Sequence, residues 1–111
     1  FTYGTPDPPR FHFDHTHLGL LTPEECNRLY NRCTVGLCLS SSNPSRIPFE
    51  MMAAGLPPVD FHGDNTVYDL PDGCVLLAEK NPASLAGAVI RILDDPRLRA
   101  TMREKGLAFM R

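Results

Sequence analysis

One segment of the chain combines a turn of the phosphate-binding type with a following carboxylate. Small hydroxyl and turn-forming residues fill the segment 40–47 and lead into a short helix predicted over 48–54. Backbone N–H groups at a helix start lack intrahelical partners and carry partial positive charge, so they suit phosphate oxygens. A guanidinium adds a fork of donors for the same group. The candidate residues for binding an anion are therefore Ser42, Asn43, Ser45, Arg46 and Ile47.

Glu50 is the carboxylate that follows this turn. It lies one turn into the predicted helix, beside the apolar residues Phe49 and Met51. A carboxylate in apolar surroundings needs a hydrogen-bonding partner, and the diol of a ribose is a suitable one. In the alternative interpretation, Ser45 only caps the helix and Glu50 pairs with a nearby arginine. The spacing by itself leaves both interpretations open.

The surrounding elements alternate between apolar runs of strand length and capped amphipathic stretches. Strands are predicted over 11–18, 35–39, 57–61 and 74–78, and helices over 22–33, over 82–93 and from Asp95-Pro96 onward. Thr22-Pro23-Glu24-Glu25 is a capping box, which favours a helix start. This order predicts a single α/β domain with a Rossmann-like parallel sheet and flanking helices. Such sheets bind ligands at the carboxyl ends of their strands, which points to the loop after 35–39.

The helical period also predicts which side chains reach the core. The helix 82–93 is expected to bury Leu85, Ala86, Val89, Ile92 and Leu93. The last helix is expected to bury Leu98, Met102, Phe109 and Met110.

Five stretches in a fixed order resemble a known enzyme family. They are 18–25, 29–33, 35–40, 48–57, and 81–86 followed by 92–95. Together they resemble the carboxyl-terminal domain of the retaining glycosyltransferases of the GT-B fold, which use sugar nucleotides. The loop Asn43-Pro44-Ser45, followed by Pro48 and Glu50, further resembles rhamnosyltransferases of rhamnan and S-layer glycan synthesis.

The resemblance implies a role for Glu50 and a departure at Ser42. In the family a pair of glutamates spans this loop, and the second one, which holds the nucleotide ribose, falls on Glu50. The first falls on Ser42, so its acidic partner is missing and no catalytic residue is assigned. The resemblance implies that the chain binds a nucleotide-diphosphate sugar donor without a metal or another cofactor.

The same resemblance implies that the chain is part of a longer enzyme. The glycan acceptor would bind through an amino-terminal domain outside these 111 residues, so no turnover is expected from this part alone. The alternative from another class is a non-catalytic module that binds a sugar nucleotide or a protein. Ser42 in place of a glutamate favours that alternative slightly.

A cluster of histidines near the start invites a metal-site hypothesis. His12, Asp14, His15 and His17 lie within six residues. On the predicted strand, however, His15 and His17 share one face while His12 and Asp14 share the other. Four ligands on opposite faces cannot converge on one ion, so we expect no metal site.

The charge and cysteine content of the chain limit which partners and which compartment are expected. The chain has 11 Lys and Arg against 13 Asp and Glu, with a net charge of −2, and no basic stripe for nucleic acid. The basic run Arg97, Arg99, Arg103, Lys105 and Arg111 is typical of a solvated helix face, and peripheral contact with anionic lipid stays open. The 4 cysteines form no Cys-x-x-Cys pair and are expected to be reduced, which favours a cytoplasmic location.

Overall fold

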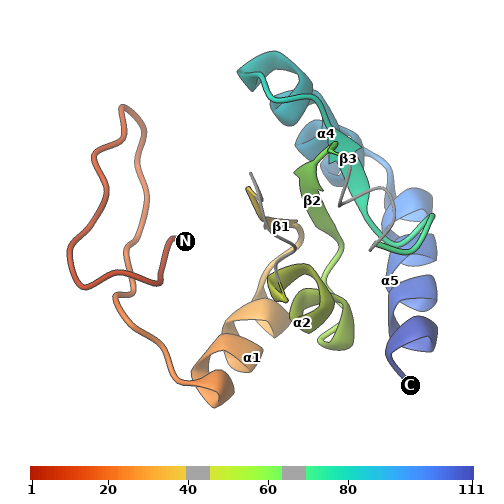
Figure 1. Cartoon of the computed structure of the whole chain (residues 1–111), viewed down its shortest axis with the longest axis horizontal. Helices are drawn as coiled ribbons and strands as arrows, with labels where there is room; N and C mark the ends of the chain where they lie inside the picture. Colours follow the sequence, from red (N-terminus) through yellow and green to blue (C-terminus); the bar gives the residue numbers. More distant parts are fainter. Residues whose placement is uncertain (40–45, 64–69) are drawn as a thin grey trace.

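The computed structural model describes residues 1–39, 46–63 and 70–111 of the chain (Figure 1). In these residues an amino-terminal segment without helices precedes an alternation of helices and short strands. The elements are α1 (Pro23–Arg32), β1 (Gly36–Leu37), α2 (Ile47–Ala53), β2 (Pro58–Phe61), β3 (Leu76–Ala78), α4 (Pro82–Asp94) and α5 (Pro96–Met110).

The three strands form one parallel sheet in the order β1-β2-β3. Gly36 pairs with Pro58, and Val59 pairs with Leu76. The predicted α/β class with a parallel, Rossmann-like sheet and flanking helices is therefore confirmed. The strands are shorter than predicted. Cys74 and Val75, for example, precede β3, and the N–H of Cys74 donates to the carbonyl oxygen of Pro71 within a turn, at 3.3 Å.

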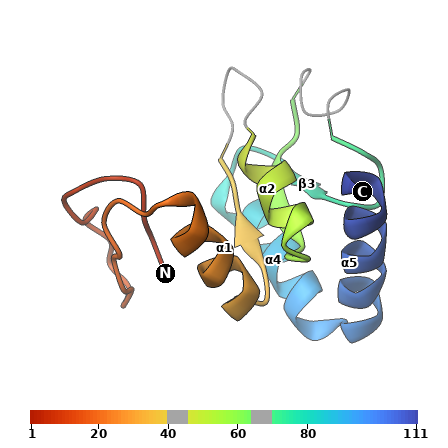
Figure 2. The same ribbon diagram turned by 90° about the horizontal axis from the view of Figure 1, so that it is seen from below.

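The strand predicted over 11–18 is wrong. These residues form no strand, and only an isolated parallel bridge links His17 to Thr2. Phe11 and Phe13, which were expected on a sheet, instead stack on each other with their ring centroids 4.7 Å apart, and both remain exposed. Alternation alone does not make a strand, because an extended segment needs a neighbouring edge for its backbone hydrogen bonds. The segment lies to one side of the sheet, beyond α1 (Figures 1 and 2).

Helices cover both faces of the sheet. On one face, the fully buried Val59 of β2 packs with Ala78 and with Ile92 of α4. On the other face, Met52 of α2 packs with Cys74 and Val75. Figure 2 shows α2 and α4 on opposite sides of the sheet.

Two predictions of the buried face of α4 need correction. Ala86 is exposed, and Leu93 keeps 46% of its surface exposed. The core side of the helix instead carries Leu85, Ala88, Val89 and Ile92. With 3.6 residues per turn, these four side chains lie along one narrow stripe of the helix surface, and Ala86 and Leu93 lie at the edge of that stripe.

Helix α5 packs on the rest of the molecule through Leu98, Met102 and Gly106, and its last turn is open. Met102 is buried and Leu98 is partly buried, as predicted, but Phe109 and Met110 remain 53% and 39% exposed. The helix contacts α2 where Gly106 meets Met52. Beyond that point the Phe109 ring stacks on Phe49, with centroids 6.3 Å apart, and its other side stays open because this is the last turn of the helix.

Candidate functional site

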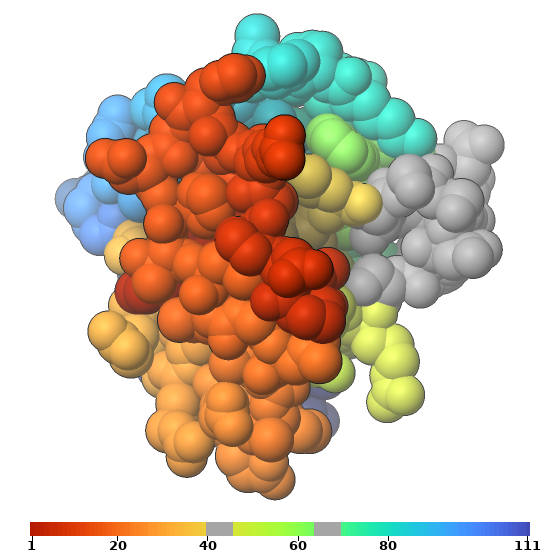
Figure 3. All heavy atoms as spheres, turned by 90° about the vertical axis from the view of Figure 1, so that its left-hand side faces the viewer, coloured from red at the N-terminus to blue at the C-terminus, as the bar shows by residue number. Residues whose placement is uncertain are grey.

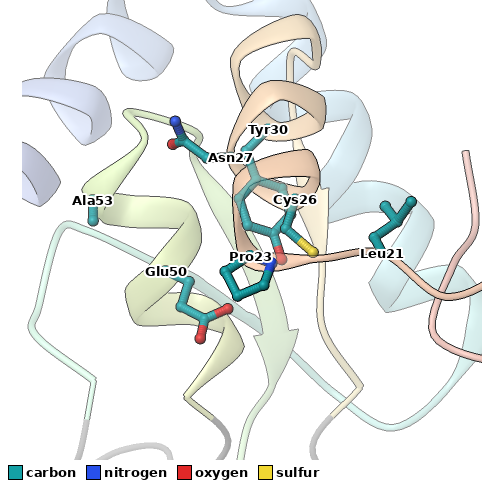
Figure 4. A pocket seen from close by; sticks show the side chains of 7 residues that line it. All are labelled: Leu21, Pro23, Cys26, Asn27, Tyr30, Glu50 and Ala53. Atoms are coloured by element: carbon teal, nitrogen blue, oxygen red, sulfur yellow. The ribbon is translucent and has the colours of Figure 1, made fainter.

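Helices α1 and α2 enclose a cleft with a volume of about 380 Å³ (Figure 4). The wall from α1 is mostly apolar, and the wall from α2 contributes a carboxylate. The lining residues are Leu21, Pro23, Cys26, Asn27, Tyr30, Glu50 and Ala53. A volume of this size lies in the range of small-ligand pockets.

Glu50 is the acidic residue that the sequence singled out, and it lines this cleft. Its backbone N–H donates to the carbonyl oxygen of Arg46, at 3.1 Å, in the first turn of α2. Met51 and Met52 on the same helix are buried, whereas Glu50 is exposed. In Figure 4 its side chain lies on the side of α2 that faces α1, next to Pro23. The helix therefore buries one side in the core and presents a carboxylate to the cleft on the other.

The remaining predicted residues divide into two groups. Arg46 is the exposed N-cap of α2, and its side chain does not cap the helix. Ile47 begins α2 and packs against the core cluster that contains Tyr30. Ser42, Asn43 and Ser45 lie outside the described residues. Of the predicted set, the structure therefore places Arg46, Ile47 and Glu50 on one short helix start.

The α1 wall of the cleft depends on a pair of tyrosines. Tyr30 is only 4% exposed, and its hydroxyl group is hydrogen-bonded to the hydroxyl of Tyr3. The two rings meet edge to face, with centroids 6.2 Å apart and planes at 60°. Tyr30 follows Cys26 by four residues, the spacing of neighbours on one helix face, whereas nothing in the sequence links either residue to Tyr3.

Among the described residues in and behind the cleft, the Glu50 carboxylate lies near hydroxyl and thiol groups. Burial raises the pKa of the Tyr3 and Tyr30 hydroxyls and of the Cys26 thiol, and the nearby charge of Glu50 raises each further. These groups therefore stay protonated at neutral pH. A carboxylate among uncharged groups favours a ligand that donates hydrogen bonds, such as a diol, and disfavours an anion at the same point.

A second carboxylate lies near the carboxyl end of the central strand β2. Asp60 on the central strand β2 is 1% exposed, and one of its carboxylate oxygens accepts a hydrogen bond from the N–H of Phe61 at 2.7 Å. Sequence reasoning missed this residue, although an acid in the apolar run 57–61 was a visible signal. Buried carboxylates need such partners. Asp60 therefore joins Glu50 as an acidic group near the strand ends, where parallel sheets bind ligands.

The histidine cluster is arranged for hydrogen bonding. His17 has one ring nitrogen, Nδ1, 2.9 Å from the hydroxyl oxygen of Thr2. The other, Nε2, lies 2.8 Å from the carbonyl oxygen of Thr5. Because a carbonyl only accepts, Nε2 carries the proton in this contact, and Nδ1 accepts from Thr2. In the part of the chain that the structure describes, no three His, Cys, Asp or Glu side chains are placed to hold a metal ion.

The basic run on α5 includes two arginines that bind backbone groups. Arg99 donates to the carbonyl oxygens of Ile92 and Leu93 at the end of α4, at 3.1 and 2.9 Å. Arg103 donates to the carbonyl oxygen of Gly55. These contacts give both side chains a structural role. None of the described helices has the length and apolar character that a bilayer span requires.

Comparison with known proteins places the chain in a family. Residues 3–89 match the family described as "WsaF, C-terminal domain", and this match includes the cleft between α1 and α2 as well as all three strands. No curated protein matches the chain closely enough to count as a relative. Because the match covers most of the chain, this protein belongs to the WsaF C-terminal domain family, whose domains are associated with glycosyltransferases.

Proposed function

We propose that the chain is the donor-binding part of a glycosyltransferase for polysaccharide or surface glycan synthesis. In this proposal the cleft between α1 and α2 holds the nucleoside of a nucleotide-diphosphate sugar. The observation that carries it is Glu50, which lines a ligand-sized cleft in a chain that matches a glycosyltransferase-associated domain over residues 3–89.

The lining of the cleft matches the chemistry of a nucleoside. The carboxylate of Glu50 accepts hydrogen bonds from the two ribose hydroxyls. The apolar surfaces of Leu21, Pro23 and Tyr30 offer contact to a flat base. Arg46, exposed at the start of α2 four residues before Glu50, is the cation that we assign to the diphosphate.

The proposal assigns binding to this chain and leaves transfer to the longer enzyme. No residue here is given a catalytic role, and the acceptor glycan would be supplied through a separate domain. Because the loop before α2 resembles that of rhamnosyltransferases, a rhamnosyl nucleotide is the first complete donor to examine. Contact with an anionic membrane surface through the basic side of α5 remains a secondary proposal.

Calorimetry with UDP and dTDP tests the role of Glu50. Glu50→Gln keeps the size of the side chain and removes its charge. Loss of a charge-assisted hydrogen bond is expected to weaken binding by about ten- to a hundredfold, with the thermal midpoint of unfolding unchanged. Glu104→Gln is the matched control, because Glu104 is an exposed glutamate of α5 outside the cleft, and its substitution is expected to leave affinity intact. Equal affinities for Glu50→Gln and the wild type would refute the ribose role.

The second candidate function is a binding module without transfer activity. Ser42, which stands where the family has its first glutamate, favours this candidate. A transfer assay with the longer protein separates the two functions. Nucleotide binding with no transfer, together with transfer restored by Ser42→Glu, would identify the module as an enzyme that has lost its catalytic activity.

A further inference from the structure

We infer that Tyr3 is a positioning residue for the cleft. Tyr3 does not line the cleft, but it holds the side chain of Tyr30, which does. Tyr3 thereby controls the shape of the α1 wall and the affinity of the ligand bound against it. The ligand class rests on the proposed function, since the ligand named here is the nucleoside diphosphate part of the donor.

The contact between the two tyrosines fixes the Tyr30 ring at two points. The hydroxyl at its tip is hydrogen-bonded to the hydroxyl of Tyr3. The edge-to-face ring contact, with planes at 60°, restrains rotation about the ring axis. A tyrosine side chain has only two rotatable torsions, so these contacts hold it in one rotamer. The cleft wall is therefore set before a ligand arrives, which reduces the entropy lost on binding.

Backbone hydrogen bonds hold Tyr3 itself in place. On one side of Tyr3, the N–H of Thr2 donates to the carbonyl oxygen of Thr16 at 3.0 Å. The N–H of Leu18 donates to the carbonyl oxygen of Thr2 at 2.8 Å. On the other side, the N–H of Gly4 donates to the carbonyl oxygen of Gly19, also at 2.8 Å. Backbone hydrogen bonds to residues 16–19 thus join this segment on both sides of Tyr3.

The same segment continues directly into the cleft. From Gly19 the chain reaches Leu21 and Pro23, which both line the cleft, within four residues. Figure 3 shows this amino-terminal segment and α1 next to each other on one face of the molecule. Phe1 adds a contact to the far end of α1, where the Arg32 guanidinium lies 5.5 Å from its ring centroid. Tyr3, the segment and the α1 wall therefore form one continuous set of contacts.

The test compares single hydroxyl deletions. Tyr3→Phe and Tyr30→Phe each remove one partner of the hydroxyl pair and keep the rings. Thr5→Val is the control, because it removes a hydroxyl from the same segment, and that hydroxyl bonds the carbonyl oxygen of Asp7, outside the cleft. Calorimetry with UDP and dTDP gives the affinity of each variant. Tyr3→Phe is expected to weaken binding by about two- to tenfold, the size of one neutral hydrogen bond, and Thr5→Val to leave it unchanged.

A second readout reports the cleft wall without any nucleotide. Cys26 lines the cleft, whereas Cys33, the C-cap residue that follows α1, does not, and both residues are partly buried. Alkylation with N-ethylmaleimide, followed by peptide mass spectrometry, gives the ratio of their rates. Release of the Tyr30 ring in Tyr3→Phe is expected to raise the Cys26 rate several-fold relative to Cys33. The double variant Tyr3→Phe/Tyr30→Phe is expected to match Tyr30→Phe, because the bond that Tyr3→Phe removes is already absent in Tyr30→Phe.

The outcomes separate this inference from the proposed function. If the wild type binds UDP or dTDP and Tyr3→Phe binds it equally well, the positioning role is refuted. Additive effects of Tyr3→Phe and Tyr30→Phe would refute it as well. If the wild type binds neither nucleotide, the proposed function fails, and the alkylation ratio decides the positioning role. An unchanged ratio in Tyr3→Phe then overturns it, and a raised ratio supports it.

Discussion

The guanidinium of Arg103 in α5 donates a hydrogen bond to the backbone carbonyl oxygen of Gly55, at 3.3 Å. Gly55 ends the turn after α2, the helix that carries Glu50, and its φ angle is +79°. This contact joins residues 48 positions apart and attaches the end of α2 to the last helix. The placement of the candidate site thus depends on a glycine that no other residue type replaces without strain.

Gly55→Ala is predicted to destabilise the fold by about 1–2 kcal/mol, because L-residues avoid positive φ. The added Cβ would also lie 2.3 Å from Nη1 of Arg103, so the guanidinium must move and its hydrogen bond is lost. Urea unfolding measures the change. Gly87→Ala is the control, since Gly87 lies within α4 with open space around it and is predicted to gain about 0.5–1 kcal/mol. Equal stability of Gly55→Ala and the wild type would contradict the requirement for glycine at this position.

Two neighbouring residues of α4 are predicted to differ sharply in how much stability the protein loses when each is replaced by alanine. Ile92 has no exposed surface, and Ile92→Ala is expected to lower the free energy of unfolding by about 2–5 kcal/mol through lost contacts and a cavity. Leu93 is 46% exposed, and Leu93→Ala is expected to change it by about 0.5 kcal/mol or less. Thermal unfolding of the two variants checks this contrast. Similar losses at both positions would mean that Leu93 is covered in the native protein.

Stability is predicted to fall at alkaline pH partly because of Cys38. Burial, followed by the charges of Asp60 and Glu50, raises the pKa of this thiol from 9.0 to about 12. The folded state therefore keeps a proton that the unfolded state loses. This contribution is complete below about pH 9 and is lost as the pH rises toward about 12.

Cys38→Ala measures that contribution as a difference in slope. Between these two pH values its free energy of unfolding should fall less steeply than that of the wild type, although its absolute stability is lower because of lost packing. The tyrosines titrate in both proteins and cancel in the comparison. Parallel slopes would show that the thiol is exposed to solvent.

The histidine segment is predicted not to bind zinc specifically. Both ring nitrogens of His17 are engaged, with Thr2 and with Thr5. Titration with zinc, followed by equilibrium dialysis and elemental analysis, is expected to show no stoichiometric uptake. Uptake of one zinc per chain that disappears in His15→Ala/His17→Ala would overturn this prediction.

The sequence by itself determined the class of the fold and the local starts of its helices. Thr22 accepts a hydrogen bond from the N–H of Glu25, as the capping box predicts, and Asn81 caps α4 in the same way. The apolar runs 35–39, 57–61 and 74–78 each contain a strand of the sheet. These features are local, because they depend on side chains within a few residues of one another, and a linear pattern contains that information.

Only the tertiary structure decided which distant residues meet. The segment 11–18 alternates like a strand, yet it has no sheet edge beside it and stays irregular. Tyr3 and Tyr30, 27 residues apart, form the hydroxyl pair behind the cleft. Glu50 was identified in the sequence, but its position opposite Pro23 and Cys26 follows from the packing of α2 against α1. Such contacts depend on how whole elements pack in space, and the spacing of residues along the chain does not specify that arrangement.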